Sequence, residues 1–303
     1  MLRGVNTILL TGAGGFIGGA LARRLRADGH EVCGLDLAET ACGERPAVQI
    51  THDLTAPLPP AYLAGIDLVI HTAALAGVQA SWDRPDAYWN VNAHGTALLR
   101  RACDQAGQPR VIHLSSISVY GEGLRLSENS ATHPLSPYGR SKLAGEGAWA
   151  GYPYATVVRL SNVYGPGQRT DMAYATFIRA ALDGRPITLR DGGRQLRTPT
   201  YIDDCVAGIV AAMQRGADGR TYNVAGPQDV RLAEVPVLLG DLLGCRIASR
   251  AVAPAAGDPR IATVLSDRAT RELGYVPQTP VREGLAGQVA ALAAATPLRA
   301  ATS

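Results

Sequence analysis

The chain has 303 residues, of which 47% are hydrophobic and 18% charged, and its formal net charge is +3. A chain of this length can bury a sizeable core as one large domain or two coupled ones. The small, scattered positive charge offers no footprint for nucleic acid, and no apolar run reaches the length of a membrane span, so neither partner is expected. The five cysteines are dispersed without a CxxC pair, which favours free thiols in a reducing cytoplasm over a disulfide framework or a metal site.

The first predicted strand, Thr7–Thr11, is a short apolar run, and a segment of helical period follows over residues 20–25. Between them lie the glycines of a GxxGxxG pattern, Gly12, Gly15 and Gly18. Glycines at a strand-to-helix junction permit a tight turn and let the backbone approach a pyrophosphate, whose charge the helix N-terminus attracts. The pattern in this context predicts a dinucleotide-binding loop.

The second predicted strand, Glu31–Asp36, ends in an acid about 20 residues beyond the glycines, where a carboxylate can accept both hydroxyls of a ribose. Leu37, Ala38 and Glu39 follow it, and none of them is an Arg that could neutralise a 2′-phosphate. The sequence therefore predicts NAD rather than NADP as the cofactor.

Further apolar strands are predicted along the chain, each separated by a helix-like segment, at residues 47–50, 67–71, 110–115 and 154–160. Alternating strands and helices predict right-handed crossovers and an α/β fold, a Rossmann-type doubly wound parallel sheet covered on both faces. After Gly165 the rhythm breaks into loops rich in Pro and Gly, which indicates a smaller, irregular C-terminal substrate lobe. We therefore expect an NAD-binding domain over residues 1–165 with returning segments near 197–225, and a substrate-binding lobe over 166–196 and 226–303.

Tyr138 and Lys142 stand four residues apart in a segment that should begin a helix, because Ser136 is a good N-cap and Pro137 a good first helical residue. At this spacing the two side chains share one helical face. An ammonium beside a phenol favours the phenolate, and a fall of about three pKa units, worth roughly 4 kcal/mol, would make Tyr138 a base at neutral pH. The alternative is a surface Tyr and Lys on an ordinary helix.

Several short motifs lie in a characteristic order along the chain. They are Asp53-Leu54, His71-Thr72-Ala73-Ala74 and the stretches 88–96, 115–121, 159–166, 197–204 and 267–274. Together with the glycine spacing, these motifs resemble the extended short-chain dehydrogenases/reductases, in the NAD-dependent sugar epimerase/dehydratase group. The resemblance covers nearly the whole length.

The resemblance implies a catalytic set of Ser116, Tyr138 and Lys142. In this family the tyrosinate takes a proton from a sugar hydroxyl while the same carbon gives hydride to the nicotinamide. Lys142 would lower the pKa of Tyr138 and bond the nicotinamide ribose, and Ser116 would hold the reacting oxygen.

The resemblance also implies binding roles, in which Asp53 would meet the adenine amino group and Asn92 would be a structural Asn. Cofactor contacts are implied for Gly12, Gly15, Phe16, Ile17, Gly18, Asp36, Asp53, Leu54, Thr72, Ala73, Ala74, Asn92, Tyr138 and Lys142. Contacts with a nucleotide-sugar substrate are implied for Ser81, Ser116, Ser118, Asn162, Arg169 and Arg197. Among these, Asn162 would touch a phosphate or the sugar, and Arg197 the nucleotide diphosphate.

The two positions after Ser116 help to choose among the reactions of the group. Dehydratases carry an Asp-Glu pair there and decarboxylases a Glu, whereas this chain has Ile117 and Ser118, neither of which is a general acid. The Ser-x-Ser pattern resembles the 4-epimerases, including those that act on UDP-glucuronate. In that comparison Ser118 and Arg169 would lie near a sugar carboxylate; the alternative for Arg169 is a solvated loop charge.

Two departures from the family pattern bear on substrate and assembly. Nucleotide-sugar enzymes usually carry a second diphosphate-binding Arg where this chain has Ala255, and losing such a contact would cost about 1.5–3 kcal/mol of affinity. Gly145 and Gly147 crowd the end of the Tyr-Lys helix, which relatives extend and often use in a two-fold dimer. A homodimer is expected all the same, on a shorter helix.

The leading hypothesis is an NAD-dependent nucleotide-sugar 4-epimerase. The alternative, which Ala255 favours, is a keto-sugar reductase or a dehydrogenase of a sugar or smaller alcohol. A third reading is a non-catalytic NAD-binding protein, and the complete set of Ser116, Tyr138 and Lys142 argues against it.

Overall fold

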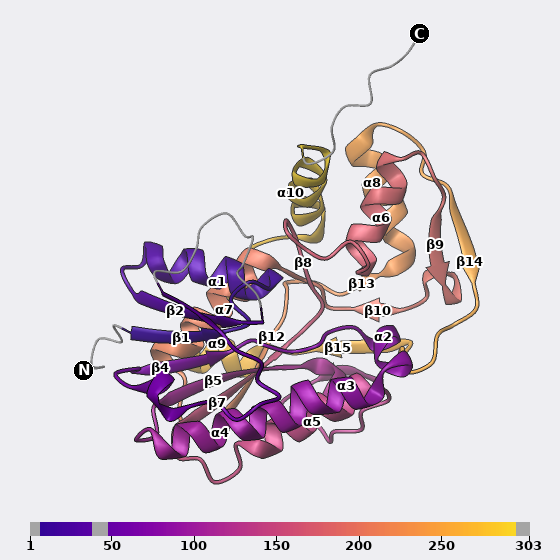
Figure 1. Ribbon diagram of the computed structural model, residues 1–303. Coiled ribbons are helices and arrows are strands. Elements are labelled where there is room, and N and C mark those ends of the chain that lie inside the picture. Colours follow the sequence, from indigo (N-terminus) through magenta and orange to yellow (C-terminus); the bar gives the residue numbers. More distant parts are fainter. Residues whose placement is uncertain (1–6, 38–47, 295–303) are drawn as a thin grey trace.

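The main element of the protein is a seven-stranded sheet in the order β12-β7-β5-β4-β1-β2-β3, seen in a computed structural model that describes residues 7–37 and 48–294 (Figure 1). Each neighbouring pair of its strands is parallel. The strands are β1 (Thr7–Thr11), β2 (Glu31–Asp36), β3 (Val48–Thr51), β4 (Leu68–His71), β5 (Arg110–Ser116), β7 (Ala155–Leu160) and β12 (Thr221–Val224). The predicted α/β fold with a Rossmann-type parallel sheet is confirmed. Ala38, Glu39 and Ala47, used in the sequence analysis, lie outside the described residues.

Helices cover both faces of this sheet (Figure 1). One face packs against α1 (Phe16–Ala27), α7 (Ile202–Arg215) and α9 (Asp267–Leu273), and the other against α4 (Thr96–Gln105) and α5 (Pro137–Ala148). Because side chains alternate along a strand, Ile8 and Leu10 of β1 belong to the first core while Leu9 belongs to the second. Burial of each such side chain stabilises the fold by about 1.5–3 kcal/mol.

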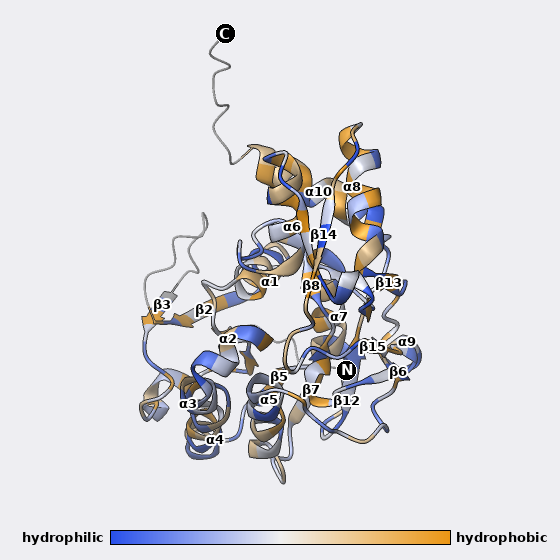
Figure 2. Ribbon diagram, turned by 90° about the vertical axis from the view of Figure 1, so that its right-hand side faces the viewer, coloured by the Kyte–Doolittle hydropathy of each residue, from blue (hydrophilic) through white to orange (hydrophobic). Residues whose placement is uncertain are grey.

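The C-terminal lobe is smaller and built around its own core. Its helices are α6 (Ala173–Leu182), α8 (Val235–Leu243) and α10 (Val281–Ala294), and hydrophobic residues gather on α8 and α10 in Figure 2. Two short strands, β9 (Ile187–Arg190) and β14 (Ser249–Val252), pair in parallel beside them. Tyr174, Ile178, Val235 and Leu285 lie in this third core, which is separate from the two cores that cover the main sheet.

The segment near residues 197–225 divides between two sheets. Helix α7 and strand β12 return to the main sheet, but Arg197 lies in β10, which belongs to a four-stranded sheet of order β13-β10-β15-β6. The strands of that sheet are β13 (Val230–Arg231), β10 (Leu196–Arg197), β15 (Ile261–Val264) and β6 (Gly123–Leu126). A further pair joins β8 (Val163–Tyr164) to β11 (Thr200–Tyr201).

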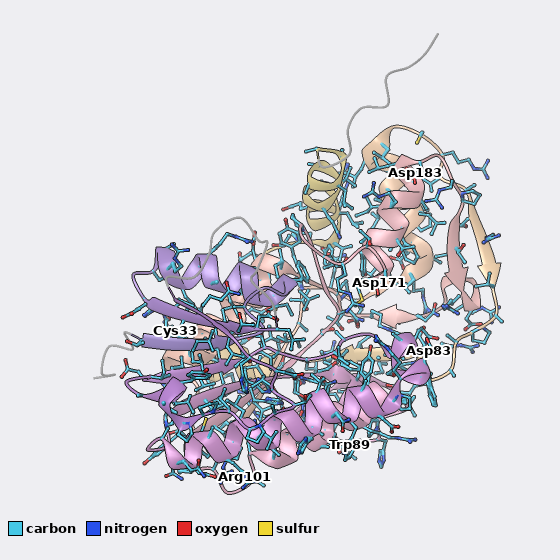
Figure 3. The ribbon with its side chains drawn as sticks, in the orientation of Figure 1. Cys33, Asp83, Trp89, Arg101, Asp171 and Asp183 are labelled. Carbon is cyan, nitrogen blue, oxygen red and sulfur yellow. The ribbon has the colours of Figure 1, made fainter. Side chains whose placement is uncertain are left out.

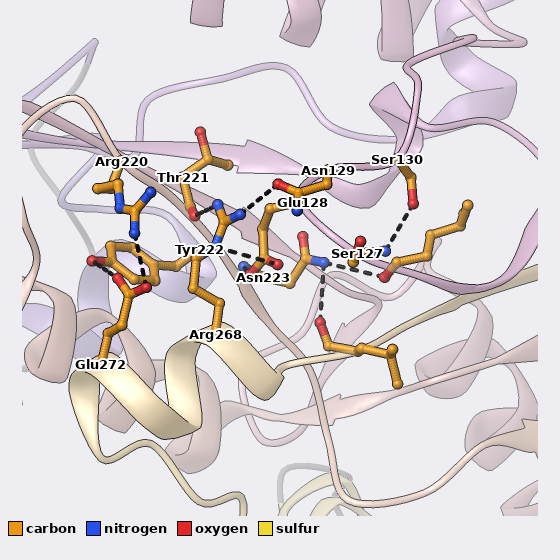
Figure 4. A network of polar contacts seen from close by, with 12 residues as sticks. Ser127, Glu128, Asn129, Ser130, Arg220, Thr221, Tyr222, Asn223, Arg268 and Glu272 are labelled. Carbon is orange, nitrogen blue, oxygen red and sulfur yellow. Dashed lines mark hydrogen bonds and ion pairs between the residues drawn. The ribbon is translucent and has the colours of Figure 1, made fainter.

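The edge strand β12 is held by side chains rather than left open to another strand (Figure 4). Glu128 Oε1 accepts the backbone N–H of Asn223 at 2.8 Å, and the Asn223 amide nitrogen donates to Leu126 and Leu265 carbonyls. Glu272 accepts the Tyr222 hydroxyl at 2.9 Å and pairs with Arg220 at 3.0 Å. These contacts occupy polar groups of an edge that could otherwise template pairing with another chain.

The helix α5, which carries Tyr138 and Lys142, begins as its sequence predicts. The Ser136 hydroxyl oxygen accepts the Gly139 N–H at 3.1 Å, Pro137 is the first helical residue, and α5 ends at Ala148 after 12 residues. The remaining elements are α2 (Val78–Asp83), α3 (Pro85–Trp89), the π-helical segment Asn90–Gly95, and the short 3-10 turns Pro60–Leu63, Ile117–Val119, Asp191–Gly193 and Leu232–Glu234. None of the helices in the described ranges is long and apolar enough to cross a membrane.

Candidate active site

A cavity of about 700 Å³ opens at the carboxyl ends of the central strands, between the main sheet and the C-terminal lobe. This edge of an open parallel sheet is where ligands bind in doubly wound folds. The predicted residues that line the cavity are Gly12, Gly15, Phe16, Ile17, Gly18, Asp36, Asp53, Leu54, Thr72, Ala73, Ala74, Ser116, Ser118, Tyr138, Lys142, Asn162, Arg169 and Arg197. Ser81 and Asn92 are not among the lining residues.

The glycine loop leaves no room for larger residues. Gly12 has a φ of +69°, and a Cβ there would stand 2.7 Å from the backbone nitrogen of Ala73. A Cβ on Gly18 would collide with the carbonyl oxygen of Gly12. The backbone therefore approaches the cavity closely at the start of α1, as a dinucleotide cradle requires.

The carboxylate of Asp36 is fixed beside this loop. Its two oxygens accept the backbone N–H groups of Gly14 at 2.9 Å and Leu37 at 2.7 Å. The side chain is therefore oriented by backbone before any ligand arrives, at the end of β2 where a ribose acceptor is predicted.

The carboxylate of Asp53 is bonded by a residue of its own loop. The Asp53 carboxylate accepts the N–H and hydroxyl of Thr55, both at 2.8 Å, and these bonds lower its pKa.

His71 is buried and bridges the hydroxyls of Thr11 and Thr96 at 2.8 and 2.9 Å. Burial lowers the pKa of His71 to about 3, with the nearby Lys142 charge acting in the same direction, so the ring is neutral at physiological pH. His71 supports the cavity wall from behind.

Asn92 has a structural place, in the interior behind the cavity. Its Oδ1 accepts the Leu75 N–H at 2.8 Å, and its Nδ2 donates to the Leu75 carbonyl at 3.0 Å and to the Ser141 hydroxyl at 2.9 Å. The amide thereby ties the segment after β4 to helix α5. These bonds agree with the structural role predicted for Asn92, and the cofactor contact stays a prediction.

Ser81 also lies in the interior. Its side chain is fully buried and its hydroxyl donates to the Val78 carbonyl at 2.6 Å within α2. The substrate contact that the resemblance implies for Ser81 stays a prediction.

Ser116, Tyr138 and Lys142 converge in the cavity wall from two elements, the end of β5 and the first turns of α5. The Ser116 hydroxyl bonds the Tyr138 phenol and also donates to the Ser118 hydroxyl at 3.1 Å. The ring of Tyr88 meets Tyr138 edge to face, with centroids 6.1 Å apart. The reacting groups predicted from scattered motifs thus lie in one place.

The predicted lowering of the Tyr138 pKa by Lys142 is not found. Burial raises the pKa of Tyr138, although the Ser116 hydrogen bond opposes the rise. The Lys142 ammonium instead donates to the Leu114 carbonyl at 2.6 Å, and burial lowers its own pKa to about 8. The sequence showed the spacing of the pair but not its surroundings, where burial disfavours both charged forms.

A buried ion pair joins helix α5 to strand β7. Glu146 Oε2 and Arg159 Nη2 lie 2.6 Å apart, and Glu146 Oε1 accepts both Arg159 Nε and the Ser115 hydroxyl. The Arg159 guanidinium also lies over the Tyr120 ring, 4.7 Å from its centroid. Sequence reasoning missed this cluster, whose only local signal is Glu146 four residues after Lys142. It fixes α5 against β5 and β7.

Arg169 lies on the loop between β8 and α6. It pairs with Asp171, which stands just before α6 (Figure 3), through bonds of 3.0 and 2.5 Å, and its Nη1 donates to the Ala76 carbonyl at 3.4 Å. Its side chain is 52% exposed. The guanidinium therefore contacts both its own loop and the segment after β4, while about half of the side chain stays exposed to solvent.

Arg197 is largely occupied by protein groups. Its Nη2 pairs with Asp258 at 2.6 Å and bonds the Pro259 carbonyl, while its Nη1 donates to the carbonyls of Leu196 and Arg260. The segment 254–259 that it holds is also anchored on the other side, where the Ala256 carbonyl accepts Gln79 Nε2 at 3.2 Å and Trp82 Nε1 at 3.1 Å. We call this segment the strap. Gly257, Asp258 and Pro259 of the strap line the cavity.

The parallel sheet, the glycine cradle and the Ser116–Tyr138–Lys142 cluster define an NAD-binding enzyme of the extended short-chain dehydrogenase/reductase type. The model of the NAD-dependent epimerase/dehydratase family matches residues 8–225. This chain therefore belongs to the NAD-dependent epimerase/dehydratase family, as its motifs predict, and the NAD predicted from Asp36 is the cofactor of that family.

Individual relatives are similar over almost the full chain. An uncharacterized UDP-glucose epimerase of Bacillus subtilis, YtcB, is 33% identical over 94% of this chain and 97% of its own length. The structure of MoeE5 in complex with UDP-glucuronic acid and NAD is 34% identical, with a TM-score of 0.91 over 96% of this chain and all of that one. The UDP-glucuronic acid 4-epimerase of Bacillus cereus, solved with UDP-glucuronic acid and NAD, has a TM-score of 0.89 at 30% identity over 96% of this chain and all of its own.

Proposed function

We propose that this protein is an NAD-dependent nucleotide-sugar 4-epimerase that acts by transient oxidation to a 4-keto sugar and return of hydride to the opposite face. The observation that carries the proposal is the convergence of Ser116, Tyr138 and Lys142 on one cavity, with the non-acidic Ile117 and Ser118 beside them. Elimination of water needs a general acid and base next to the reacting carbon, and these two positions supply neither. The similarity to 4-epimerases supports the same reading.

In this mechanism Tyr138 takes the proton of the sugar 4-hydroxyl through its phenolic oxygen and later returns it to the same oxygen. Ser116 donates a hydrogen bond to the reacting oxygen and, through its contact with the phenol, keeps the two groups aligned. In this proposal the Lys142 ammonium, on the same face of α5, favours the phenolate and opposes the burial that raises the pKa of Tyr138. NAD, when bound against the glycine cradle, supplies the acceptor and donor of the hydride.

The substrate we propose is an acidic nucleotide sugar, such as UDP-glucuronate. Arg169 reaches the cavity wall at Ala76, and the Ser118 hydroxyl stands beside Ser116, so a carboxylate on the sugar would meet a cation and a hydroxyl. Two of the similar solved structures hold UDP-glucuronic acid. The alternative for Arg169, a solvated loop charge, is supported by its ion pair with Asp171.

A net oxidoreductase remains the second candidate, because the diphosphate contacts are weaker than the family pattern leads one to expect. Ala255 replaces an Arg, and Arg197 directs both terminal nitrogens at protein oxygens. A keto-sugar reductase or a sugar or alcohol dehydrogenase would depend less on a nucleotide diphosphate.

Incubation with NAD and a panel of UDP- and dTDP-sugars separates these functions. The proposed epimerase interconverts a sugar pair without accumulating absorbance from NADH, and UDP-glucuronate is turned over faster than UDP-glucose. A dehydrogenase accumulates NADH in proportion to product. Tyr138→Phe should lower the rate by about 10²- to 10⁴-fold without unfolding the protein; an unchanged rate would rule out Tyr138 as the base.

Assembly and location rest on the sequence arguments. We propose a homodimer in the cytoplasm, since relatives use the Tyr-Lys helix in a two-fold contact and the described cysteines Cys33, Cys103, Cys205 and Cys245 are free thiols. Light scattering during size-exclusion chromatography would measure the mass, and a monomer would contradict the dimer.

A further inference from the structure

The C-terminal helix α10 carries one buried polar side chain on an otherwise apolar face. Gln288 is 1% exposed, and the other buried residues of the helix are Val281, Gly284 and Leu285. The glycine at 284 lets the helix approach closely, because a Cβ there would collide with the Tyr164 hydroxyl of β8. Helix α10 therefore packs against the end of β8, where the loop over residues 165–172 begins.

Gln288 bonds a residue of the cavity wall. Its Nε2 donates to Gln168 Oε1 at 2.9 Å, and Gln168 Nε2 donates in turn to the Val163 carbonyl at 2.9 Å. Gln168 is 8% exposed and lines the cavity, and its backbone N–H donates to the Gly165 carbonyl at 3.1 Å. Both ends of the Gln168 amide are therefore fixed, immediately before Arg169 in the chain.

The bonded side chains of Gln168 and Gln288 lower the stability of the fold relative to apolar side chains in the same space. A buried polar group stabilises the fold only when all its hydrogen-bonding capacity is used, and Gln288 Oε1 has no partner among the residues of the described ranges. Two aliphatic side chains of similar length would fill the space without that penalty. The pair does, however, specify a single orientation for Gln168, which aliphatic side chains cannot do.

We propose that Gln288 is a positioning residue that fixes Gln168 and thereby sets the loop over residues 165–172 so that Arg169 faces the sugar carboxylate. Gln288 does not touch the substrate and acts through the backbone that joins residues 168 and 169. The inference rests on the proposed function, in which Arg169 recognises the acidic sugar.

The test compares Gln288→Met with the wild-type enzyme on UDP-glucuronate and UDP-glucose. Met keeps the length of the side chain and removes the donor. The KM for UDP-glucuronate should rise about fivefold or more, with kcat for UDP-glucose and its KM changed by less than about twofold. Hydrogen–deuterium exchange over residues 165–172 should become faster, while exchange in β1 and α1 stays the same.

Two further variants separate positioning from stability. In Gln168→Met/Gln288→Met both partners are apolar, so the unfolding midpoint should return toward the wild-type value while the raised KM for UDP-glucuronate persists. Leu285→Val lowers stability from the same buried face of α10 without touching Gln168, and it should leave the ratio of the two KM values unchanged.

Equal losses on both substrates, or a Leu285→Val enzyme with the same selectivity change as Gln288→Met, would overturn the inference. Failure of the wild-type enzyme to act on any acidic nucleotide sugar would overturn the proposed substrate instead. In that event the exchange measurement still decides whether Gln288 orders the loop, and unchanged exchange over residues 165–172 would refute it.

Discussion

The ammonium of Lys142 donates to the carbonyl oxygen of Leu114 at 2.6 Å, so the end of β5 holds this lysine in place. The lysine is buried, and burial lowers its pKa to about 8, although Glu146 opposes the shift. We therefore expect removal of this buried charge to lower the activity of the protein but to raise its stability.

Replacing Lys142 by Met should abolish activity and increase stability. The folded pKa of about 8 lies below the unfolded value of about 10.5, so the unfolded chain binds more protons between these two pH values. The folded wild-type protein therefore gains stability as pH rises through this window, by up to about 1.4 kcal/mol per pH unit. Lys142→Met lacks the titrating group and should lose this gain. Urea unfolding at pH 7.5 and 9.5 measures the difference, and equal pH slopes would contradict it.

Acid should destabilise the fold through two buried histidines. His71 and His113 lie on adjacent strands with ring centroids 5.2 Å apart, and burial lowers the pKa of His71 to about 3 and that of His113 well below its usual range. The unfolded chain takes up these protons near pH 6.5, so stability is lost as pH falls below that value, by up to about 1.4 kcal/mol per pH unit for each ring.

His113→Leu is the informative variant for this prediction. Neither ring nitrogen of His113 has a hydrogen-bond partner within residues 7–37 and 48–294. Leu should therefore be tolerated at pH 7 and should make the loss of stability between pH 6.5 and 5 shallower. Chemical unfolding at these pH values checks the slope, and a slope as steep as that of the wild type would count against His113.

Introducing an Arg at Ala255 should strengthen nucleotide diphosphate binding. Ala255 lies in the strap, next to the Ala256 carbonyl that Gln79 and Trp82 hold, so the new side chain starts from a fixed backbone. A charge-assisted contact contributes about 1.5–3 kcal/mol, which is at least a tenfold fall in the Kd for UDP. Calorimetry on Ala255→Arg measures it, with Ala255→Met as the uncharged control. Equal affinities of the two variants would mean that this end of the cavity does not meet a diphosphate.

A matched pair of glycine substitutions tests the cofactor cradle. A Cβ at Gly18 would collide with the Gly12 carbonyl, whereas a Cβ at Gly147 of α5 meets no atom within 4 Å. Gly18→Ala should therefore lose most NAD affinity, seen by fluorescence titration. Gly147→Ala should bind NAD normally and stabilise the helix by up to about 1 kcal/mol, since Ala exceeds Gly in helix propensity. Normal NAD binding by Gly18→Ala would show that the loop can relax.

The sequence identified those parts of the structure that depend on local pattern. The apolar run of β1, the Ser136 cap and the glycine spacing each follow from a few neighbouring residues, and the structure contains all three. Ser116 and Tyr138, which were singled out by their motifs, both line the cavity.

Features that depend on distant partners were not predictable in this way. The pKa of Tyr138 depends on the residues that pack around it, and the contacts of Arg197 depend on Asp258, which lies 61 residues further along the chain. Glu146 and Arg159 come together across two elements, and the local sequence of neither residue identifies the other as its partner. Asn92 and Ser81 belong to the right segments but point into the protein, because one turn of a helix presents both a lining and a buried face.

The side chain of Asn92 bonds Leu75, in the segment after β4, and Ser141, one residue before Lys142. One amide thus ties a lining segment of the cavity to the helix that carries Tyr138 and Lys142. A substitution at Asn92 would therefore loosen two walls of the cavity at once, although its own side chain lines neither.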